Sequence, residues 1–235
     1  MHVFYLHGFA SSARSSKARF FGERLASLGL PLHCPDFNEP DFSTLTVTRM
    51  LDQVDAAIAA LPAGPVTLIG SSLGAFVAWH AAARRASRNG GAGAAAGAGP
   101  GAAGDSHPVE KLVLLAPALD FGANRMKELG EDGLAKWKAT NKLEFFHYGY
   151  NEPRSVHYEL YEDARRYDST RVTVDVPTLV FHGRRDALVD PVMVEEFCAA
   201  RPSMTLHMLD DEHQLLAHLD FLWRETAAFL NLPRG

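Results

Sequence analysis

The 235-residue sequence contains only two cysteines, Cys34 and Cys198, which excludes a fold held together by a set of disulfides. The two are not spaced as CxxC, so the sequence offers no cysteine-based metal site, and we expect a reducing compartment. Basic residues are also in the minority, because 23 Lys and Arg stand against 28 Asp and Glu, for a formal net charge of -5. The sequence therefore predicts no nucleic-acid partner.

Long apolar runs are missing as well. No stretch of 18 residues is apolar enough to span a membrane, and the first residues lack the basic and apolar regions of a signal peptide. We therefore expect a cytoplasmic protein without a membrane span. Hydrophobic residues nevertheless make up 47% of the chain and charged residues 22%. These proportions are ordinary for a globular protein and provide enough apolar material for one sizeable core.

One segment has almost no side chains with which to build a core. Residues 89–104 consist of glycine and alanine apart from Asn89 and Pro100. Glycine at this density disfavours a helix, at a cost of about 1 kcal/mol per position relative to alanine. We interpret residues 89–107 as a flexible surface loop. The alternative interpretation is a hinge or docking segment.

The rest of the sequence alternates short apolar runs with amphipathic segments. Strands are predicted at residues 3–6, 32–34, 66–69, 111–116, 178–181 and 205–209. Helices are predicted at residues 15–28, 43–61, 73–85 and 213–230. Short strands that are apolar on both faces and joined by helices are typical of a parallel sheet covered on both sides. Residues 120–167 interrupt this alternation, and we interpret them as a mainly helical insertion.

Residues 70–74 read Gly-Ser-Ser-Leu-Gly and fit the pattern G-x-S-x-G. They lie between an apolar strand and an apolar helix, which is the setting of a nucleophile elbow. In such an elbow the central serine takes a strained conformation that exposes its hydroxyl, and the glycines let strand and helix approach closely. Ser72 is therefore the candidate nucleophile, since Ser71 is not at the central position. The alternative is an ordinary strand-to-helix turn.

Two backbone amides are candidates for binding an oxyanion. One belongs to Leu73, because the start of a helix presents free N–H groups and the positive end of the helix dipole. The other belongs to Phe9, which follows the first strand in the segment His7-Gly8-Phe9. His7 is an alternative catalytic base, but we interpret it as a residue that orders this loop.

A serine nucleophile needs a base, and the base needs a carboxylate that orients it. Asp186 is the candidate acid, because it follows the strand at residues 178–181 on the edge of the sheet where active sites form. Asp190 is the rival. It precedes Pro191 and fits the cap of the next helix better.

His213 is the candidate base, since it follows the last predicted strand. The alternative is a surface histidine in an acidic loop. His207 lies within the strand itself, and His218 is expected inside the closing helix. Eleven histidines occur in the chain, so the position after the last strand carries this assignment.

Taken in order, His7-Gly8-Phe9, residues 70–74, the segment HGRRD at residues 182–186 and Asp211-Glu212-His213 resemble the α/β-hydrolase superfamily. The likeness covers nearly the whole chain. The segments YLHGFASS and GSSLG are most similar to small bacterial serine esterases of the YqiA type and to related acyl-thioesterases. The resemblance implies one α/β-hydrolase domain over residues 1–235, with a mostly parallel sheet of about six strands, helices on both faces, and residues 120–167 as a lid. The family's usual first antiparallel strands are missing.

The resemblance also implies a reaction. Ser72 attacks an acyl carbonyl, His213 takes the proton and returns it to the leaving group, and Asp186 orients the imidazole. The amides of Phe9 and Leu73 hold the oxyanion. The expected substrate is a small acyl ester or thioester, and no cofactor or metal is implied. Hydrolysis of a carbon–carbon or amide bond by the same residues is one alternative, and a non-catalytic binding protein is another.

The insertion is rich in aromatic residues. These are Trp137, Phe145, Phe146, Tyr148, Tyr150, Tyr158 and Tyr161. They suit an apolar acyl pocket, and they suit equally the burial of the insertion against the core. Its basic residues include Lys127, Lys136, Lys138 and Arg154. These either meet an anionic substrate such as an acyl-CoA or form a solvated face.

Overall fold

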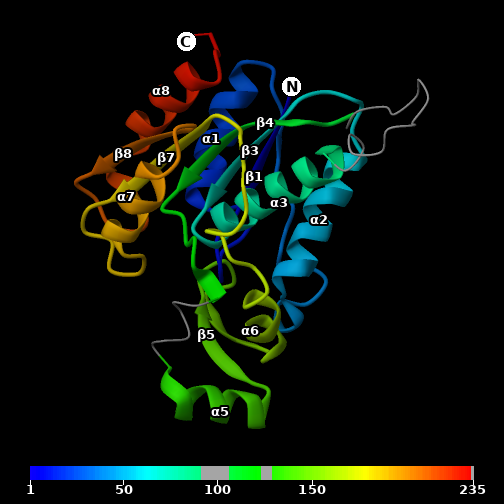
Figure 1. Cartoon of the computed structure of the whole chain (residues 1–235), viewed down its shortest axis with the longest axis vertical. Coiled ribbons are helices and arrows are strands. Elements are labelled where there is room, and N and C mark those ends of the chain that lie inside the picture. Colours follow the sequence, from blue (N-terminus) through cyan, green and yellow to red (C-terminus); the bar gives the residue numbers. More distant parts are fainter. Residues whose placement is uncertain (91–105, 123–128, 234–235) are drawn as a thin grey trace.

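The computed structural model describes residues 1–90, 106–122 and 129–233. At its centre is a parallel sheet of six strands in the order β2-β1-β3-β4-β7-β8 (Figure 1). The strands are β1 (His2–Leu6), β2 (Leu32–His33), β3 (Val66–Ser71), β4 (Val109–Leu115), β7 (Thr178–Gly183) and β8 (Met204–Leu209). The predicted parallel sheet of about six strands is confirmed.

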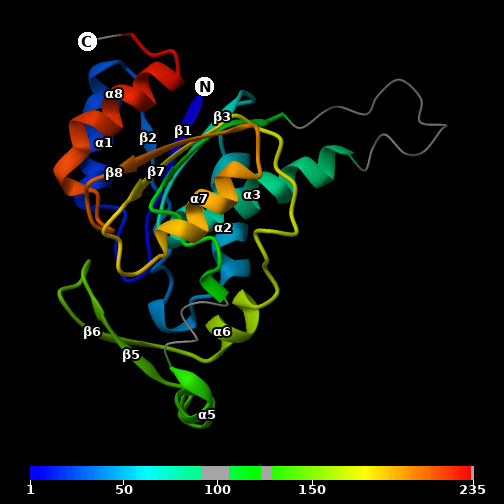
Figure 2. The same cartoon turned by 60° about the vertical axis from the view of Figure 1, so that its left-hand side comes forward.

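Helices cover both faces of this sheet (Figures 1 and 2). One face carries α1 (Ser16–Ser27) and α8 (Leu219–Phe229), and the other carries α2 (Val47–Ala59), α3 (Leu73–Gly90) and α7 (Pro191–Ala199). Alternate residues of β1 face opposite cores: Val3 and Tyr5 pack on the α1 side, Phe4 and Leu6 on the α2 side. Because both faces are covered, the strands are apolar at successive positions.

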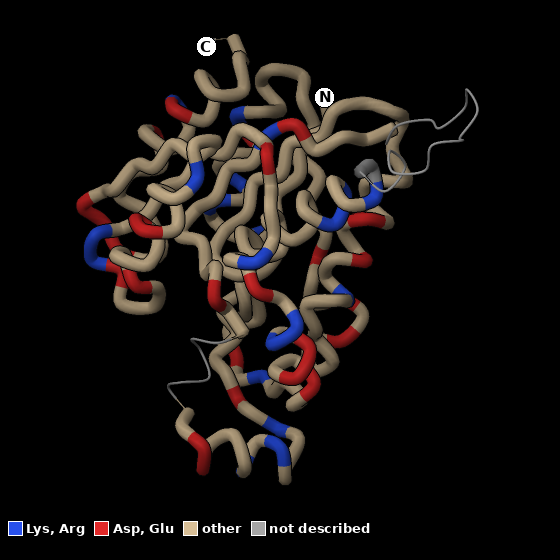
Figure 3. The backbone as a smooth tube through the Cα atoms, viewed as in Figure 1, with Lys and Arg blue, Asp and Glu red and all other residues tan. Residues whose placement is uncertain are grey.

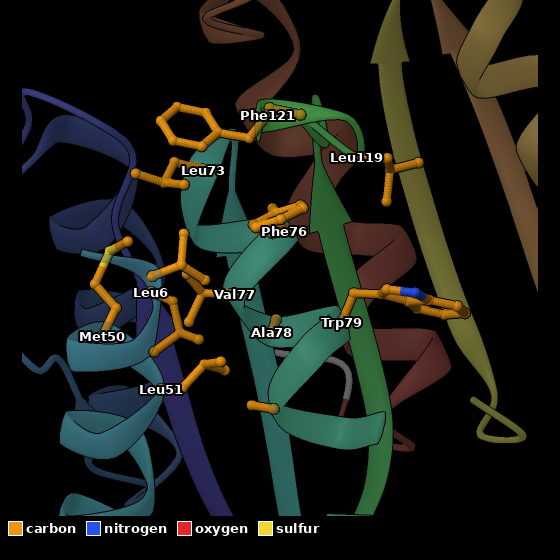
Figure 4. Packing of buried hydrophobic residues seen from close by; sticks show 14 of the residues in the cluster. Leu6, Met50, Leu51, Leu73, Phe76, Val77, Ala78, Trp79, Leu119 and Phe121 are labelled. Carbon is orange, nitrogen blue, oxygen red and sulfur yellow. The ribbon is translucent and has the colours of Figure 1, made fainter. Parts of the chain in front are cut away.

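The larger core lies between β1, α2 and α3. Figure 4 shows Leu6, Met50, Leu51 and Val77 directed toward one another, and each is at most 2% exposed. The buried positions of α2 recur with the 3.6-residue helical period, as the sequence predicted. Burying one such side chain stabilises the fold by about 1.5–3 kcal/mol.

Capping residues set several helix starts. Ser15 accepts a hydrogen bond from the amide of Ala18 at the start of α1, and Asp190 accepts one from Val192 at the start of α7. Thr46 caps α2 in the same way. The helix predicted over residues 43–61 is therefore two elements, the short 3-10 helix η1 (Phe42–Thr44) and α2.

The closing helix also begins later than predicted. A 3-10 turn, η2 (Leu216–His218), precedes α8, and Leu215 before it has a positive φ of 54°. A continuous helix from residue 213 is thus wrong. His213 lies instead in the loop between β8 and η2.

The described part of the insertion contains strands as well as helices, and these strands were not predicted. Its described residues contain α5 (Gly130–Thr140), α6 (Glu159–Ala164) and an antiparallel pair of strands, β5 (Leu143–His147) and β6 (Glu152–Val156). Residues 143–146 of β5 alternate between half-buried and exposed side chains, as expected for a strand with one solvent face. Pro153 is tolerated in β6 because both strands of a two-stranded ribbon are edges.

The insertion follows β4 and projects beyond the sheet (Figure 2). Hydrogen bonds attach it to the segment around α2. Among them, the amide of His157 donates to the Ser43 carbonyl at 2.8 Å, and the Thr48 hydroxyl donates to Asp163 at 2.6 Å. Trp137 is 1% exposed, and its indole N–H donates to the Val156 carbonyl at 3.0 Å.

The aromatic residues of the insertion divide into two groups. Tyr158 and Tyr161 pack against Trp137 with ring centroids 5.6 and 6.4 Å away, so these three bury the insertion. Phe146 and Tyr148 remain 47% and 75% exposed. Burial of the insertion is thus seen for Trp137, Tyr158 and Tyr161, whereas the acyl pocket stays a prediction.

Basic and acidic positions are interspersed along the described chain (Figure 3). Among the described helices, none is both long and apolar enough to cross a membrane. Most of the Gly/Ala segment (residues 91–105) and Lys127 lie outside the described residues, so the flexible loop stays a prediction.

Candidate active site

Ser72 lies at the turn between β3 and α3, with a positive φ of 55°. Its amide donates to the Leu115 carbonyl of β4 at 2.8 Å, which fixes the turn against the neighbouring strand. The flanking glycines are needed here. A Cβ on Gly70 would lie 2.4 Å from the Gly74 carbonyl oxygen, and a Cβ on Gly74 would lie 1.9 Å from the Leu6 carbonyl oxygen. The strand–turn–helix setting expected of a nucleophile elbow is present.

His213 bridges Ser72 and Asp186. Its Nε2 atom is 3.0 Å from the Ser72 Oγ, and its Nδ1 is 2.7 Å from the Asp186 Oδ2. The three residues are separated by up to 141 positions in the chain. They meet because the ends of parallel strands β3, β7 and β8 share one edge of the sheet.

Asp186 is held on both carboxylate oxygens. Oδ2 faces His213, while Oδ1 accepts from the amides of Leu188 at 2.9 Å and Val189 at 3.0 Å. Burial alone raises the pKa of Asp186, but the hydrogen bonds from His213 and the two amides outweigh it and leave the pKa below its ordinary value. The residue is thus a carboxylate at neutral pH. Asp190 caps α7, as predicted.

The loop after β1 lies against the candidate nucleophile. A Cβ on Gly8 would lie 3.2 Å from the Ser71 carbonyl oxygen and 3.4 Å from the Ser72 Cβ. Phe9 follows in this loop, and Leu73 is the first residue of α3. Both predicted oxyanion amides therefore belong to segments that adjoin Ser72.

His7 is engaged with the backbone of its own loop region. Its Nδ1 lies 2.9 Å from the Gly8 carbonyl oxygen, and its Nε2 accepts from the Phe37 amide at 3.0 Å. The ring is 2% exposed. This arrangement agrees with the interpretation that His7 orders the loop. The Nε2 is also 3.3 Å from Asp36, a contact that becomes an ion pair only if His7 is protonated.

The other two candidate histidines lie elsewhere. His207 stacks on Phe181 within the sheet, with ring centroids 5.3 Å apart. His218 lies at the end of η2, and its Nδ1 is 3.0 Å from the Asp211 Oδ2. The expectation that His218 sits inside the closing helix is therefore only approximate, since it precedes α8.

Sequence reasoning missed the residues that shape the His213 loop. Asp211 accepts from the amides of Glu212 at 2.8 Å and Ala217 at 3.1 Å, besides contacting His218. Gly183 lets this loop approach β7, because a Cβ there would lie 2.5 Å from the Asp211 carbonyl oxygen. The signal in the sequence is Asp211, two positions before His213 in the segment Asp211-Glu212-His213, although the segment by itself does not predict these contacts.

Aromatic side chains surround the candidate oxyanion residue Phe9. Its ring lies 5.5 Å from Phe42, 6.2 Å from Phe121 and 4.8 Å from Phe145 of the insertion. Among the described residues, no group of three or more His, Cys, Asp or Glu could hold a metal ion. Both cysteines are free, and burial raises the pKa of each thiol to about 11, so neither is a thiolate at neutral pH.

Comparisons with known proteins address the fold. Residues 2–89 match the model of a family described as Uncharacterised protein family (UPF0227), while no curated protein matches the chain. A protein from Agrobacterium vitis S4 is 21% identical, with a TM-score of 0.81, covering 97% of this chain and 87% of its own. Mouse alpha/beta hydrolase domain-containing protein 10 is 19% identical, with a TM-score of 0.74 and coverage of 98% and 89%.

A third similar structure is a monoacylglycerol lipase from Paleococcus ferrophilus. It is 15% identical, with a TM-score of 0.69, and the match covers 97% of this chain and 93% of the lipase. At these identities the likeness concerns the fold, and it extends over almost the whole length of each protein. The chain described here therefore has the α/β-hydrolase fold.

Proposed function

We propose that this protein hydrolyses small carboxylic esters or thioesters, with Ser72 as nucleophile, His213 as base and Asp186 as the acid that orients it. The observation that carries the proposal is the continuous line of hydrogen bonds from the Ser72 Oγ through His213 to Asp186, at 3.0 and 2.7 Å. The positive φ of Ser72 adds to it, because strained backbone of this kind is concentrated at functional sites.

In the proposed first step, the neutral ring of His213 accepts the Ser72 hydroxyl proton at Nε2 while Nδ1–H donates to Asp186. The Ser72 oxygen attacks the carbonyl carbon, and the tetrahedral oxyanion is held by the amides of Phe9 and Leu73. One such donor contributes roughly 2.7–4 kcal/mol to the transition state. The intermediate then expels an alcohol or thiol, which leaves with the proton from His213, and Ser72 carries the acyl group.

In the second step, water replaces the leaving group. His213 takes a proton from the water as the oxygen attacks the acyl carbon. The same two amides hold the second oxyanion, and its collapse returns the proton to Ser72 and releases a carboxylic acid. Apart from the attacking water, the groups that act in both half-reactions are side chains and amides of this chain.

The acyl side of the substrate is proposed to be apolar. Phe9 bears a candidate oxyanion amide, and its ring packs edge-on against Phe145 of β5. The insertion thus contributes an aromatic side chain next to the site, which supports a role as a lid over the acyl group. The fold shared with an enzyme described as a monoacylglycerol lipase is compatible with such a substrate.

Turnover of p-nitrophenyl esters and acyl thioesters of graded chain length tests this proposal. We expect the wild type to hydrolyse members of this panel and Ser72→Ala to lose turnover. Ser71→Ala is the matched control, since it removes the neighbouring hydroxyl and leaves the proposed nucleophile. Hydrolysis by Ser72→Ala at the wild-type rate would overturn the proposal, as would a wild type inactive on every ester and thioester but active on an amide or carbon–carbon bond.

A further inference from the structure

A buried lysine lies next to the candidate site without a part in the proposed reaction. Lys17 is the second residue of α1 and is only 7% exposed. Lysine is almost never this buried unless its ammonium group is paired. Its Nζ donates to the backbone carbonyl of Gln214 at 2.8 Å, across 197 positions of the chain.

The accepting carbonyl belongs to the residue directly after His213. In this turn the Leu215 amide donates to the Glu212 carbonyl at 3.1 Å, and Leu215 has a positive φ of 54°. The turn over residues 212–215 is therefore closed by its own hydrogen bond. Because Gln214 directly follows His213, a shift of the Gln214 carbonyl also shifts the His213 backbone. Lys17 joins this turn to α1, an element that follows the loop containing Phe9.

We infer that Lys17 is a positioning residue that holds His213 between Ser72 and Asp186 by binding the Gln214 carbonyl. This inference rests on the proposed function. His213 must keep contacts of 3.0 and 2.7 Å on opposite sides of one ring. A displacement of about 1 Å in a catalytic group can cost on the order of a hundredfold in rate, so the anchor of this loop matters to turnover.

The charge of Lys17 also interacts with two carboxylates of the site region. Burial lowers the pKa of Lys17 to about 8, while the carboxylates of Asp211 and Asp186 act in the opposite direction. Asp211 is itself paired with His218, and Asp186 with His213. From β1, the nearby hydroxyl of Tyr5 is neutral, because burial raises its pKa above its ordinary value. Below about pH 8, Lys17 is therefore a cation that interacts with the carboxylates of Asp211 and Asp186.

The test compares Lys17→Met with wild type. The variant keeps the length of the side chain but loses the donor and the charge. We expect kcat to fall roughly ten- to a hundredfold with little change in KM, since the acyl pocket is untouched. The acidic limb of the kcat/KM profile is expected to move toward higher pH, because Lys17→Met removes a cation that interacts with Asp186, the hydrogen-bond partner of His213. Lys17→Arg, which restores a cation and a donor, is expected to return that limb toward the wild-type position.

Lys111→Met is the matched control. Lys111 also donates from Nζ to a backbone carbonyl, that of Phe229 at 2.6 Å, but it joins β4 to the end of α8. This variant is expected to lower the melting temperature without changing kcat or the pH profile. If Lys17→Met does not fold, Lys17→Gln takes its place, since it stays polar while losing the charge.

A readout that needs no substrate separates this inference from the proposed function. The His213 ring can be titrated by NMR in wild type, Lys17→Met and Lys111→Met, and we expect a shifted midpoint only in Lys17→Met. A wild type that turns over no ester contradicts the proposed function, yet the titration still decides the role of Lys17. The inference is overturned if the titration, kcat and pH profile of Lys17→Met match those of wild type and only its melting temperature changes.

Discussion

Ser72 is held in a backbone conformation that L-residues rarely adopt. A non-glycine residue at positive φ costs about 1–3 kcal/mol, and such strain persists only where the surroundings fix it. Here the amide of Ser72 binds Leu115 of the neighbouring strand, and its carbonyl accepts from the first turn of α3. The same turn directs the hydroxyl toward His213 at 3.0 Å. The residue with the strained backbone is thus also the proposed nucleophile.

The acid assignment predicts opposite outcomes for two aspartates four positions apart. Asp186→Asn removes the carboxylate that accepts from His213 Nδ1, so the wrong imidazole tautomer is favoured and kcat should fall by up to about 10⁴-fold. Asp190→Asn should keep most activity, because asparagine caps a helix nearly as well as aspartate. Measuring kcat of both variants on one ester decides the assignment. An inactive Asp190→Asn beside an active Asp186→Asn would reverse it.

At the residue scale, the sequence predicts Ser72, Asp186 and His213 at strand ends, and the structure brings the His213 side chain within hydrogen-bond distance of the other two. This succeeds because parallel strands share one active edge, so position after a strand carries spatial information. Lys17 and Asp211 escape the same reasoning. Lys17 donates to the backbone carbonyl of a residue 197 positions away. Neither the type of residue nor the spacing in the sequence predicts such a contact.

At the element scale, the packing of β1 against α3 leaves no room beside the elbow. A Cβ on Gly74 would lie 1.9 Å from the Leu6 carbonyl oxygen. Gly74→Ala should therefore lower the free energy of unfolding by about 3 kcal/mol or more, at the upper end of overpacking costs. Gly22→Ala is the control. Its Cβ would meet only Leu32 at an ordinary 3.7 Å, and alanine in a helix is favoured by about 0.5–1 kcal/mol. Urea denaturation of both variants measures the difference, and equal stabilities would contradict this account of the elbow.

The elements of the sheet were predictable because they are apolar at successive positions and follow one another in a regular order. The hairpin of β5 and β6 was not, since it is short, half exposed and interrupted by Pro153. Its pairing is decided by tertiary contacts, such as that of Trp137 with the Val156 carbonyl. The start of η2, which leaves His213 in the preceding loop, depends on the αL conformation of Leu215, a residue type that does not favour it.

At the scale of the whole molecule, a buried histidine predicts how stability changes with pH. His80 of α3 is 4% exposed, contacts the Ser169 hydroxyl at 3.2 Å and packs against the rings of Phe76 and Tyr167. Burial lowers its pKa from 6.5 to about 4. In the unfolded chain His80 is protonated below about pH 6.5, whereas in the folded chain it stays neutral down to about pH 4. The free energy of unfolding therefore decreases as the pH falls from 6.5 to about 4.

As the pH falls from 7 to 5, the titration of His80 alone should lower the free energy of unfolding by about 2 kcal/mol. Other groups titrate in the same range, so the comparison is with His80→Gln, which keeps an amide donor for Ser169. The variant should be less stable than wild type at pH 7 but show a shallower decline toward pH 5. If urea denaturation shows the same loss of stability between pH 7 and pH 5 in wild type and His80→Gln, then His80 is not the cause of the pH dependence.

The central claim is that Ser72 is an activated nucleophile. Labelling the intact protein with a fluorophosphonate and mapping the adduct by peptide mass spectrometry tests it most directly, because the reagent reacts with activated serines rather than with ordinary hydroxyls. The account predicts one adduct, on the peptide that contains residues 70–74 and at Ser72, absent from Ser72→Ala and strongly slowed in Asp186→Asn. An adduct at Ser71 or another serine that persists in Ser72→Ala, or no adduct on folded wild type, would contradict it.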